Sequence, residues 1–145
     1  MWARVVVLAG VLIACQESAT GPDRRTAQLR QLNQTQARWR SFGIHAYSFD
    51  YWMTCCWFRT HVRYVVRDDT VASAVALDSI SPNPPAPITI DTVFARARAI
   101  VVAPDYTLRI VYDTSRWYPA VTGALSVVGF DGSWTDSVSD FVPLR

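Results

Sequence analysis

The sequence contains no lysine, so all 14 of its basic residues are arginines. Together with the abundance of alanine, valine and aspartate, this bias is typical of GC-rich coding and requires no function specific to arginine. If Arg4 is removed with an amino-terminal signal, 14 − 1 = 13 arginines remain against 12 acidic residues. Such a balance argues against a nucleic-acid-binding surface.

Arrangements that are typical of enzymes are also missing. The sequence offers no Ser/His/Asp set, no glycine-rich phosphate loop and no carboxylate pair with separable acid and base roles. A structural zinc ion needs four ligands. His45 would lie roughly 30 Å from Cys55 along an extended strand, and His61 alone could not complete such a site. We therefore expect neither a metal nor a cofactor, and a protein that is not an enzyme.

Residues 1–14 are predicted to form a lipoprotein signal peptide. Arg4 precedes the apolar run Val5–Ala14, which is too short to span a bilayer, since that requires about 20 residues. The segment Leu12–Cys15 resembles a bacterial lipobox, which implies lipidation of the Cys15 sulfur and cleavage before it. The alternative is an ordinary signal peptide that contains a cysteine. No later segment is long and apolar enough to cross a membrane.

Residues 15–22 are predicted to be a lipidated tether, because Gln16–Pro22 is small, polar and without an apolar period. Fatty chains contribute about 0.8 kcal/mol per buried methylene and would hold the protein on the membrane. By analogy with lipoprotein sorting, Gln16 after the cysteine favours the outer membrane of a two-membrane cell. We expect a bacterial envelope protein at the periplasmic face of that membrane or at the cell surface.

Residues 23–145 have the size and apolar content of one domain. The segment Asp23–Phe42, closed by Gly43, predicts a helix. Its apolar stripe is narrow and includes one polar residue. The stripe consists of Leu29, Leu32, Gln36 and Trp39.

Two alternating segments predict a β-hairpin. The apolar set of the first strand is Tyr47, Phe49, Tyr51 and Met53, and that of the second is Val62, Tyr64 and Val66. A tight turn near Trp57 and Phe58, with Cys56 opposite Arg59, places both sets on one face of the sheet. A turn at Asp68–Thr70 then leads into a third strand, Val71–Leu77.

The second half of the domain repeats this order loosely. After the proline-rich loop Asp78–Pro87, Thr89 or Asp91 can cap a helix that ends before Pro104. Its apolar stripe is Val93, Phe94, Ala97, Ile100 and Val101. Further strands are expected at Leu108–Tyr112, Val121–Phe130 and Trp134–Val142. The prediction is an α+β fold: an N-terminal helix, three antiparallel strands, a second helix and two or three further antiparallel strands, with both helices on one face of the sheet.

Several segments in this order carry a family resemblance. They are the lipobox, ARWRSFGIHAYSFDY, the cysteine pair, VRYVVRDDTVASA, ITIDTVFARA and LRIVYDTSRWYPAVTG. Over about residues 37–131 the chain resembles a family of small bacterial lipoproteins known only as a domain of unknown function. The resemblance implies secretion and one α+β domain, and it carries no activity. Two features depart from the family pattern: Cys55 and Cys56 are adjacent, and Asp68-Asp69 replaces Asp-Gly at the turn.

The adjacent cysteines leave three interpretations open. Cys15 would be consumed by lipid, so Cys55 and Cys56 have only each other within the chain. A disulfide between neighbours would need a turn or bulge, since side chains in a regular strand point to opposite faces. The other possibilities are two structural thiols and a reactive or ligand role.

A possible interaction surface is predicted on the polar face of the hairpin and at a later turn. It comprises Trp52, Arg59, His61, Arg63, Arg67, Trp117 and Tyr118. In the predicted register His61 lies opposite Thr54, and Arg63 can stack on Trp52 across the strands. The alternatives are a solvated sheet face and, for Trp117-Tyr118, a cover over the end of the sheet.

We therefore predict a non-catalytic binding or interaction module that is anchored by lipid in the bacterial envelope. Its partners would be the membrane and an unidentified envelope protein, and not a nucleic acid. The alternatives are a thiol-redox-active protein using Cys55 and Cys56, although adjacency gives poor attack geometry, and an inhibitor-like secreted protein, which rests on fold analogy alone.

Overall fold

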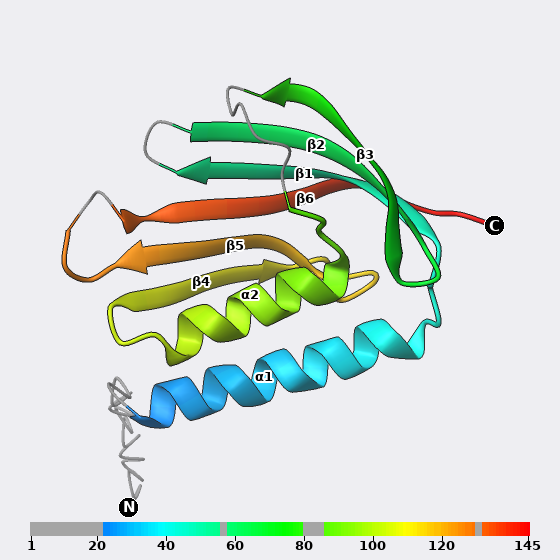
Figure 1. The fold of residues 1–145 in the computed structure, drawn as a ribbon. Coiled ribbons are helices and arrows are strands. Elements are labelled where there is room, and N and C mark those ends of the chain that lie inside the picture. Colours follow the sequence, from blue (N-terminus) through cyan, green and yellow to red (C-terminus); the bar gives the residue numbers. More distant parts are fainter. Residues whose placement is uncertain (1–21, 56–57, 80–85, 130–131) are drawn as a thin grey trace, which may run out of the picture.

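The fold is a single antiparallel sheet with two helices on one side (Figure 1). The computed structural model describes residues 22–55, 58–79, 86–129 and 132–145. Its elements are α1 (Pro22–Ser41), β1 (Tyr47–Cys55), β2 (Phe58–Arg67), β3 (Thr70–Ser79), α2 (Ile90–Val102), β4 (Tyr106–Tyr112), β5 (Pro119–Ser126) and β6 (Trp134–Pro143). The strand order is β3-β2-β1-β6-β5-β4, and all neighbours are antiparallel. The predicted α+β fold and the order of its elements are confirmed.

The β1–β2 hairpin confirms the predicted faces and corrects the predicted register. Cys55 pairs with Phe58 and Trp52 pairs with His61, whereas the sequence placed His61 opposite Thr54. The error is two residues. Because side chains alternate with a period of two, a shift of two residues leaves every side chain on its predicted face. Residue 56, which the prediction placed opposite Arg59, lies outside the described part of the chain.

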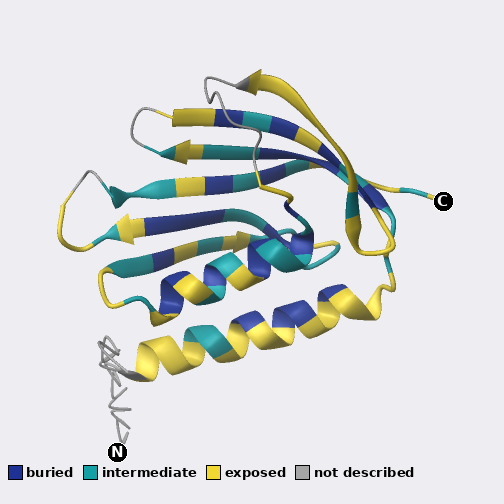
Figure 2. Ribbon diagram, in the orientation of Figure 1, coloured by how far each residue is buried: buried dark blue, intermediate teal, exposed yellow. Residues whose placement is uncertain are grey.

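The core lies between the sheet and the helices, and aromatic rings fill one end of it. Figure 2 shows the buried residues concentrated on α2 and in the middle of the strands. Trp39 of α1 packs edge-on against Tyr47, Tyr118 and Phe141, with ring centroids 5.5 to 6.1 Å apart. This geometry is favoured between aromatic rings and stabilises beyond the area that they bury. Trp39 therefore fastens the end of α1 to three strands or their connections.

The helix boundaries follow the predicted signals closely. Gly43, two residues after α1, has φ +61°, a conformation that glycine adopts without the strain a side chain would add. At α2 the cap is Thr89, whose side-chain oxygen accepts a hydrogen bond from the Thr92 amide at 3.2 Å. All five predicted stripe residues of α2 are buried. No helix in the described part of the chain has the length and apolarity needed to cross a membrane.

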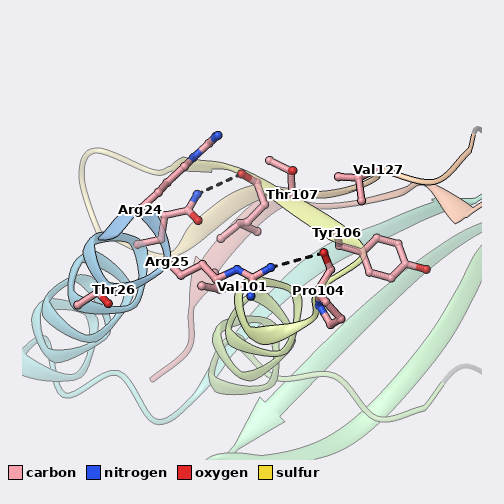
Figure 3. A pocket seen from close by; sticks show the side chains of 10 residues that line it. Arg24, Arg25, Thr26, Val101, Pro104, Tyr106, Thr107 and Val127 are labelled. Carbon is pink, nitrogen blue, oxygen red and sulfur yellow. Dashed lines mark hydrogen bonds between the residues drawn. The ribbon is translucent and has the colours of Figure 1, made fainter. Parts of the chain in front are cut away.

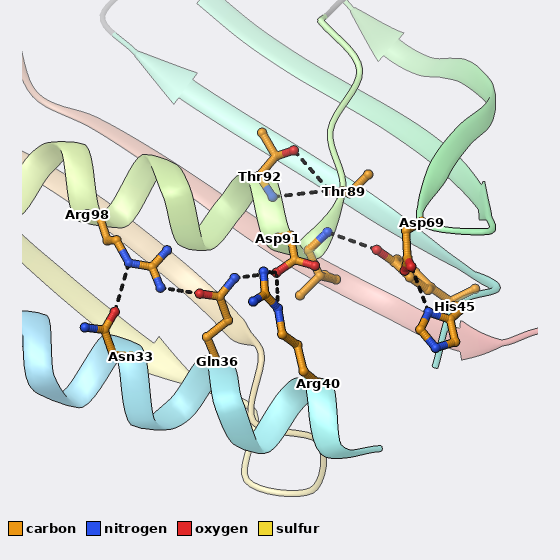
Figure 4. A network of polar contacts seen from close by, with 11 residues as sticks. Asn33, Gln36, Arg40, His45, Asp69, Thr89, Asp91, Thr92 and Arg98 are labelled. Atoms are coloured by element: carbon orange, nitrogen blue, oxygen red, sulfur yellow. Dashed lines mark hydrogen bonds and ion pairs between the residues drawn. The ribbon is translucent and has the colours of Figure 1, made fainter. Parts of the chain in front are cut away.

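A polar network joins the two helices and explains the polar residue in the α1 stripe (Figure 4). Gln36 is buried, donates a hydrogen bond to Asp91 and accepts one from Arg98. Asp91 also accepts a hydrogen bond from Arg40 at 2.9 Å, and Arg98 donates one to Asn33 at 3.1 Å. A buried amide costs little when both its donor and its acceptor are satisfied. Gln36 is thus a specific link between α1 and α2 rather than a defect in packing.

Candidate functional site

The face of the sheet opposite the helices carries the best-ordered group of candidate residues. Since the aromatic residues at 47, 49 and 51 face the helices, the alternating residues point to the other side, called here the outer face. The outer-face cluster is defined as Asp50, Trp52, Arg59, His61 and Arg63. An antiparallel sheet can leave one face to solvent, and both helices lie on the other side of this one (Figure 1).

Trp52 is the centre of a stack in the outer-face cluster. Its ring lies parallel to that of His61, with centroids 3.5 Å apart and an interplanar angle of 15°. The Arg59 guanidinium carbon lies 4.6 Å from the Trp52 ring centroid, a cation–π contact worth about 0.5–1 kcal/mol at an exposed site. The predicted stacking of Arg63 on Trp52 is wrong, because the register error placed Arg63 opposite Trp52, whereas Arg63 pairs with Asp50 and Arg59 contacts the Trp52 ring.

Arg63 instead forms an ion pair with Asp50, its partner across the strands. Arg63 donates from Nε and Nη2 to the two Asp50 carboxylate oxygens at 2.6 and 2.8 Å, the bidentate geometry that arginine favours. The hydrogen bond from Arg63 is the main reason that the pKa of Asp50 lies below its ordinary value of 3.8. His61 Nε2 lies 3.4 Å from Asp50 Oδ2, within ion-pair distance, and contributes to the lowered pKa of Asp50 less than Arg63 does.

A shallow hollow of about 420 Å³ lies beside this stack. Its lining joins β1 and β2 to β6 and consists of Trp52, Thr54, Arg59, Ser137 and Ser139. Ser137 pairs with Trp52 and Ser139 with Asp50, so the two hydroxyls border the cluster directly. The hollow offers an aromatic ring, a guanidinium group and hydroxyls to a ligand, which suits recognition of acidic or polar groups.

The remaining predicted surface residues do not join the cluster. Arg67 is exposed and pairs with Thr70 beside the β2–β3 turn, roughly 26 Å along the strand from Arg59. Trp117 lies beneath the Arg38 guanidinium of α1 at 4.5 Å, and Tyr118 is buried. An exposed Trp117-Tyr118 patch is therefore wrong for Tyr118, because its ring packs against Trp39 and Phe141. Tyr118 instead agrees with the alternative prediction, in which this residue covers the end of the sheet.

Cys55 lies on the opposite, helix-facing side of β1. It lines a pocket of about 290 Å³ with Met53, Phe58, Thr60, Arg96 and Trp134. Cys56 lies outside the described residues, so the three interpretations of the cysteine pair stay predictions. Among the residues that the structure describes, no group of three or more His, Cys, Asp or Glu side chains could hold a metal ion.

A buried carboxylate behind this pocket was missed by the sequence reasoning. Asp136 of β6 is 1% exposed, and Arg96 Nε of α2 lies 3.1 Å from its Oδ2. Burial raises the pKa of Asp136 above 3.8, although Tyr51 and Arg96 both act to lower it. Burial also raises the pKa of Tyr51. The alternation of β6 could have revealed this position, because Asp136 lies two residues before the core residue Val138 and therefore points to the same face of the sheet.

A further hollow of about 620 Å³ lies where α1 begins (Figure 3). In it Arg25 Nη2 donates to the Pro104 carbonyl at 3.5 Å, and the Gln28 amide donates to the Leu108 carbonyl at 3.3 Å. These bonds use the polar side chains of the hollow to fasten α1 to β4 and to the connection that precedes it. The hollow therefore belongs to the packing of the helix.

The comparisons with known proteins identify a family but no activity. Residues 31–122 match the model of DUF6174, described as a family of unknown function. This confirms the resemblance to a domain of unknown function, whereas lipidation and secretion stay predictions. Neither the curated proteins nor the solved structures contain a match to the chain.

Proposed function

Because the chain belongs to DUF6174, a family of unknown function, we propose its role from its own residues: it is a non-catalytic interaction module that binds an envelope protein through its outer face. The module is held on the membrane by lipid at Cys15. The partner presents an acidic segment to Arg59 and to the hollow beside Trp52.

The observation that carries this proposal is that the side chains of the outer-face cluster are held in place by contacts with one another. A solvated sheet face needs only polar side chains, whereas here a carboxylate that is 5% exposed fixes Arg63, and His61 lies flat against Trp52. Side chains that are ordered before binding lose less conformational entropy when a partner arrives. Tryptophan and arginine are also the residues that contribute most to protein interfaces.

The charge that faces outward favours an acidic partner. Asp50 is buried beneath Arg63, while half of the Arg63 side chain remains in contact with solvent and Arg59 is exposed. The negative member of the pair is thus covered and the positive member is presented. Removal of a rim charge of this kind reduces the association rate more than it increases the dissociation rate.

Lipid anchoring is the second element of the proposal and has its own test. The lipobox-like Leu12–Cys15 and the polar Gln16–Pro22 support it. Metabolic labelling with palmitate should mark the wild type and not Cys15→Ser, and Cys15→Ser should move from the membrane to the soluble fraction. Equal labelling of both proteins would show that Cys15 is not the acylated residue.

The binding surface is tested by photo-crosslinking in whole cells. A photoreactive amino acid at Thr54, which is exposed beside the hollow, should capture a partner protein. The same residue at Arg30, which is exposed on α1, is the matched control and should not. Arg59→Glu should abolish capture from Thr54, while Arg109→Glu, a charge reversal on β4, should not. Identical adducts from Thr54 and Arg30, or capture that survives Arg59→Glu, would refute the proposed surface.

A further inference from the structure

The two edges of the sheet are treated differently by the fold. At the β4 edge, the Gln28 side chain of α1 donates a hydrogen bond to the Leu108 carbonyl at 3.3 Å. Arg25 donates to the Pro104 carbonyl in the connection between α2 and β4 (Figure 3). Helix α1 thus supplies donors to the backbone at this edge, one of the ways in which proteins prevent edge-to-edge pairing of sheets.

The β3 edge has no such cover among the described residues. Every residue from Ala72 to Asp78 is exposed, and Figure 2 shows β3 in the exposed colour along most of its length. From Thr70 to Leu77 the strand contains no charged residue and no proline. Charged side chains and proline are two of the usual means of blocking an exposed edge, and β-bulges are a third. Unpaired amides and carbonyls at such an edge can accept another strand.

The usable part of the edge is its centre. The pairing of β3 with β2 shifts register at two places, between His61 and Val62 and between Val65 and Val66. Between these irregularities Ser73–Ala76 pairs regularly with Val62–Val65. Bulges twist an edge and interrupt pairing, so the outward hydrogen bonds available to another strand are concentrated at Ser73–Ala76.

We propose that β3 pairs antiparallel with β3 of a second copy of this chain, which makes a two-fold dimer with one continuous sheet. A two-fold axis perpendicular to the sheet keeps each side chain on the same face in both copies. Even-numbered residues therefore pair with even-numbered ones and odd with odd, and one residue at the centre, Ala74 or Val75, pairs with itself. In the first register Asp78 faces Thr70, and in the second it faces Ala72. Asp78 is the one charged residue within β3, so neither register sets two acidic residues opposite each other.

The side chains of β3 suit self-pairing for a second reason. Val75 is a large apolar residue that is 54% exposed on the edge strand. Pairing with a second copy covers Val75 on both protomers at once. A strand from a partner protein would have to supply this complementarity, whereas a second copy already carries it.

The dimer places two outer faces side by side. Each β2 lies three strand spacings from its counterpart, about 14 Å at 4.8 Å per strand. The two outer-face clusters then lie on the same side of a twelve-stranded sheet. The self-association stands independently of the proposed function, since it uses the edge and leaves Arg59 and Trp52 accessible.

The test compares two matched valines on the two edge strands. Val75 of β3 and Val111 of β4 are 54% and 49% exposed, so the variants Val75→Lys and Val111→Lys should fold equally well. Differently tagged full-length copies are co-expressed, and the recovery of one tag with the other is measured at equal expression. Val75→Lys in both copies sets like charges beside each other and should lower co-recovery about tenfold or more. Val111→Lys should leave it at the wild-type level.

A second readout does not depend on a substitution that opposes pairing. A photoreactive amino acid at Val75 should give a covalent product of twice the chain mass, and the same residue at Val111 should not. Absence of co-recovery in the wild type, equal loss in both lysine variants, or adducts from Val75 to other proteins without a homodimer would each overturn the proposal. Arg59→Glu should leave the dimer intact, so failure of the outer-face surface and failure of the dimer are distinguishable.

Discussion

Removal of Arg96 should destabilise the protein more than neutralisation of its partner Asp136. The Asp136 side chain is 1% exposed, and its main cationic neighbour is the Arg96 guanidinium, with Nε at 3.1 Å. Arg96 lies over the Trp134 ring at 5.0 Å and is 32% exposed, so it keeps contact with water. The pair is therefore asymmetric: one member is sealed in the core and the other reaches the surface.

The magnitudes follow from that asymmetry. Breaking a buried ion pair by removing one partner costs about 3–5 kcal/mol, because an uncompensated charge stays buried. Since Arg96 is partly hydrated, we expect the lower end, about 3 kcal/mol, for Arg96→Met. Asp136→Asn leaves no buried charge and retains the contact of Arg96 with Trp134, so its cost should be about 1 kcal/mol. Arg96→Met combined with Asp136→Asn should recover part of the loss of the first variant.

The assay is urea unfolding followed by tryptophan fluorescence and circular dichroism. Linear extrapolation gives the free energy of unfolding for the wild type, both single variants and the double variant at pH 7. The reasoning is refuted if Asp136→Asn costs as much as Arg96→Met, or if the double variant is less stable than Arg96→Met alone. Either result would mean that the charge of Asp136 is not the source of the penalty.

Three further predictions test the outer face, the end of α1 and the core. The wild type gains stability from ionised Asp50 above pH 4 and loses it as the pH falls through the lowered folded pKa of Asp50. Asp50→Asn should remove this contribution. In thermal unfolding, the midpoint temperature of the variant should therefore depend less on pH in the acid range than that of the wild type. Gly43→Ala should cost about 1 kcal/mol in urea unfolding because φ is +61°, although no atom lies within 4 Å of the added methyl. Trp39→Ala should cost about 3–5 kcal/mol in the same assay, since it empties a buried site among three aromatic rings; a loss below about 1 kcal/mol would show that α1 is not fastened there.

The fold could be predicted because its strongest signals are local and periodic. Alternation in β1 and β2 assigned every side chain to a face, and that assignment survived an error of two residues in the register. The amphipathic stripe after Thr89 and Asp91 predicted the start of α2 to within two residues, and the structure selects Thr89 as the cap. These signals depend on side-chain period and capping chemistry, which the sequence displays directly.

The candidate site was predicted only in part of its membership and not in its contacts. Arg67, Trp117 and Tyr118 do not join the outer-face cluster, and Asp50, which belongs to it, was not among the predicted residues. Trp52, Arg59, His61 and Arg63 do share the outer face, but the two-residue error assigned the wrong arginine to Trp52. A cross-strand contact depends on the exact length of the turn, and face assignment does not. Tyr118 was misplaced for a related reason, because a residue that follows a turn carries no alternation to show which way its side chain points.

The two aspartates of the central strands mark the limit of sequence reasoning about chemistry. Asp50 and Asp136 both lie within central strands, yet the pKa of Asp50 is lowered and that of Asp136 is raised. Arg63 lies directly across from Asp50 in the hairpin, so its bidentate bond outweighs desolvation; Arg96 comes from a helix and does not offset the burial of Asp136. Because the folded state binds the Asp136 proton more tightly than the unfolded state, this group's contribution to stability falls as pH rises above about 4, whereas that of Asp50 rises over the acid range up to pH 4. Asp50→Asn and Asp136→Asn should therefore change the slope of unfolding free energy against pH in opposite directions. Changes of the same sign in the two variants would show that the two carboxylates do not differ in environment as the geometry indicates.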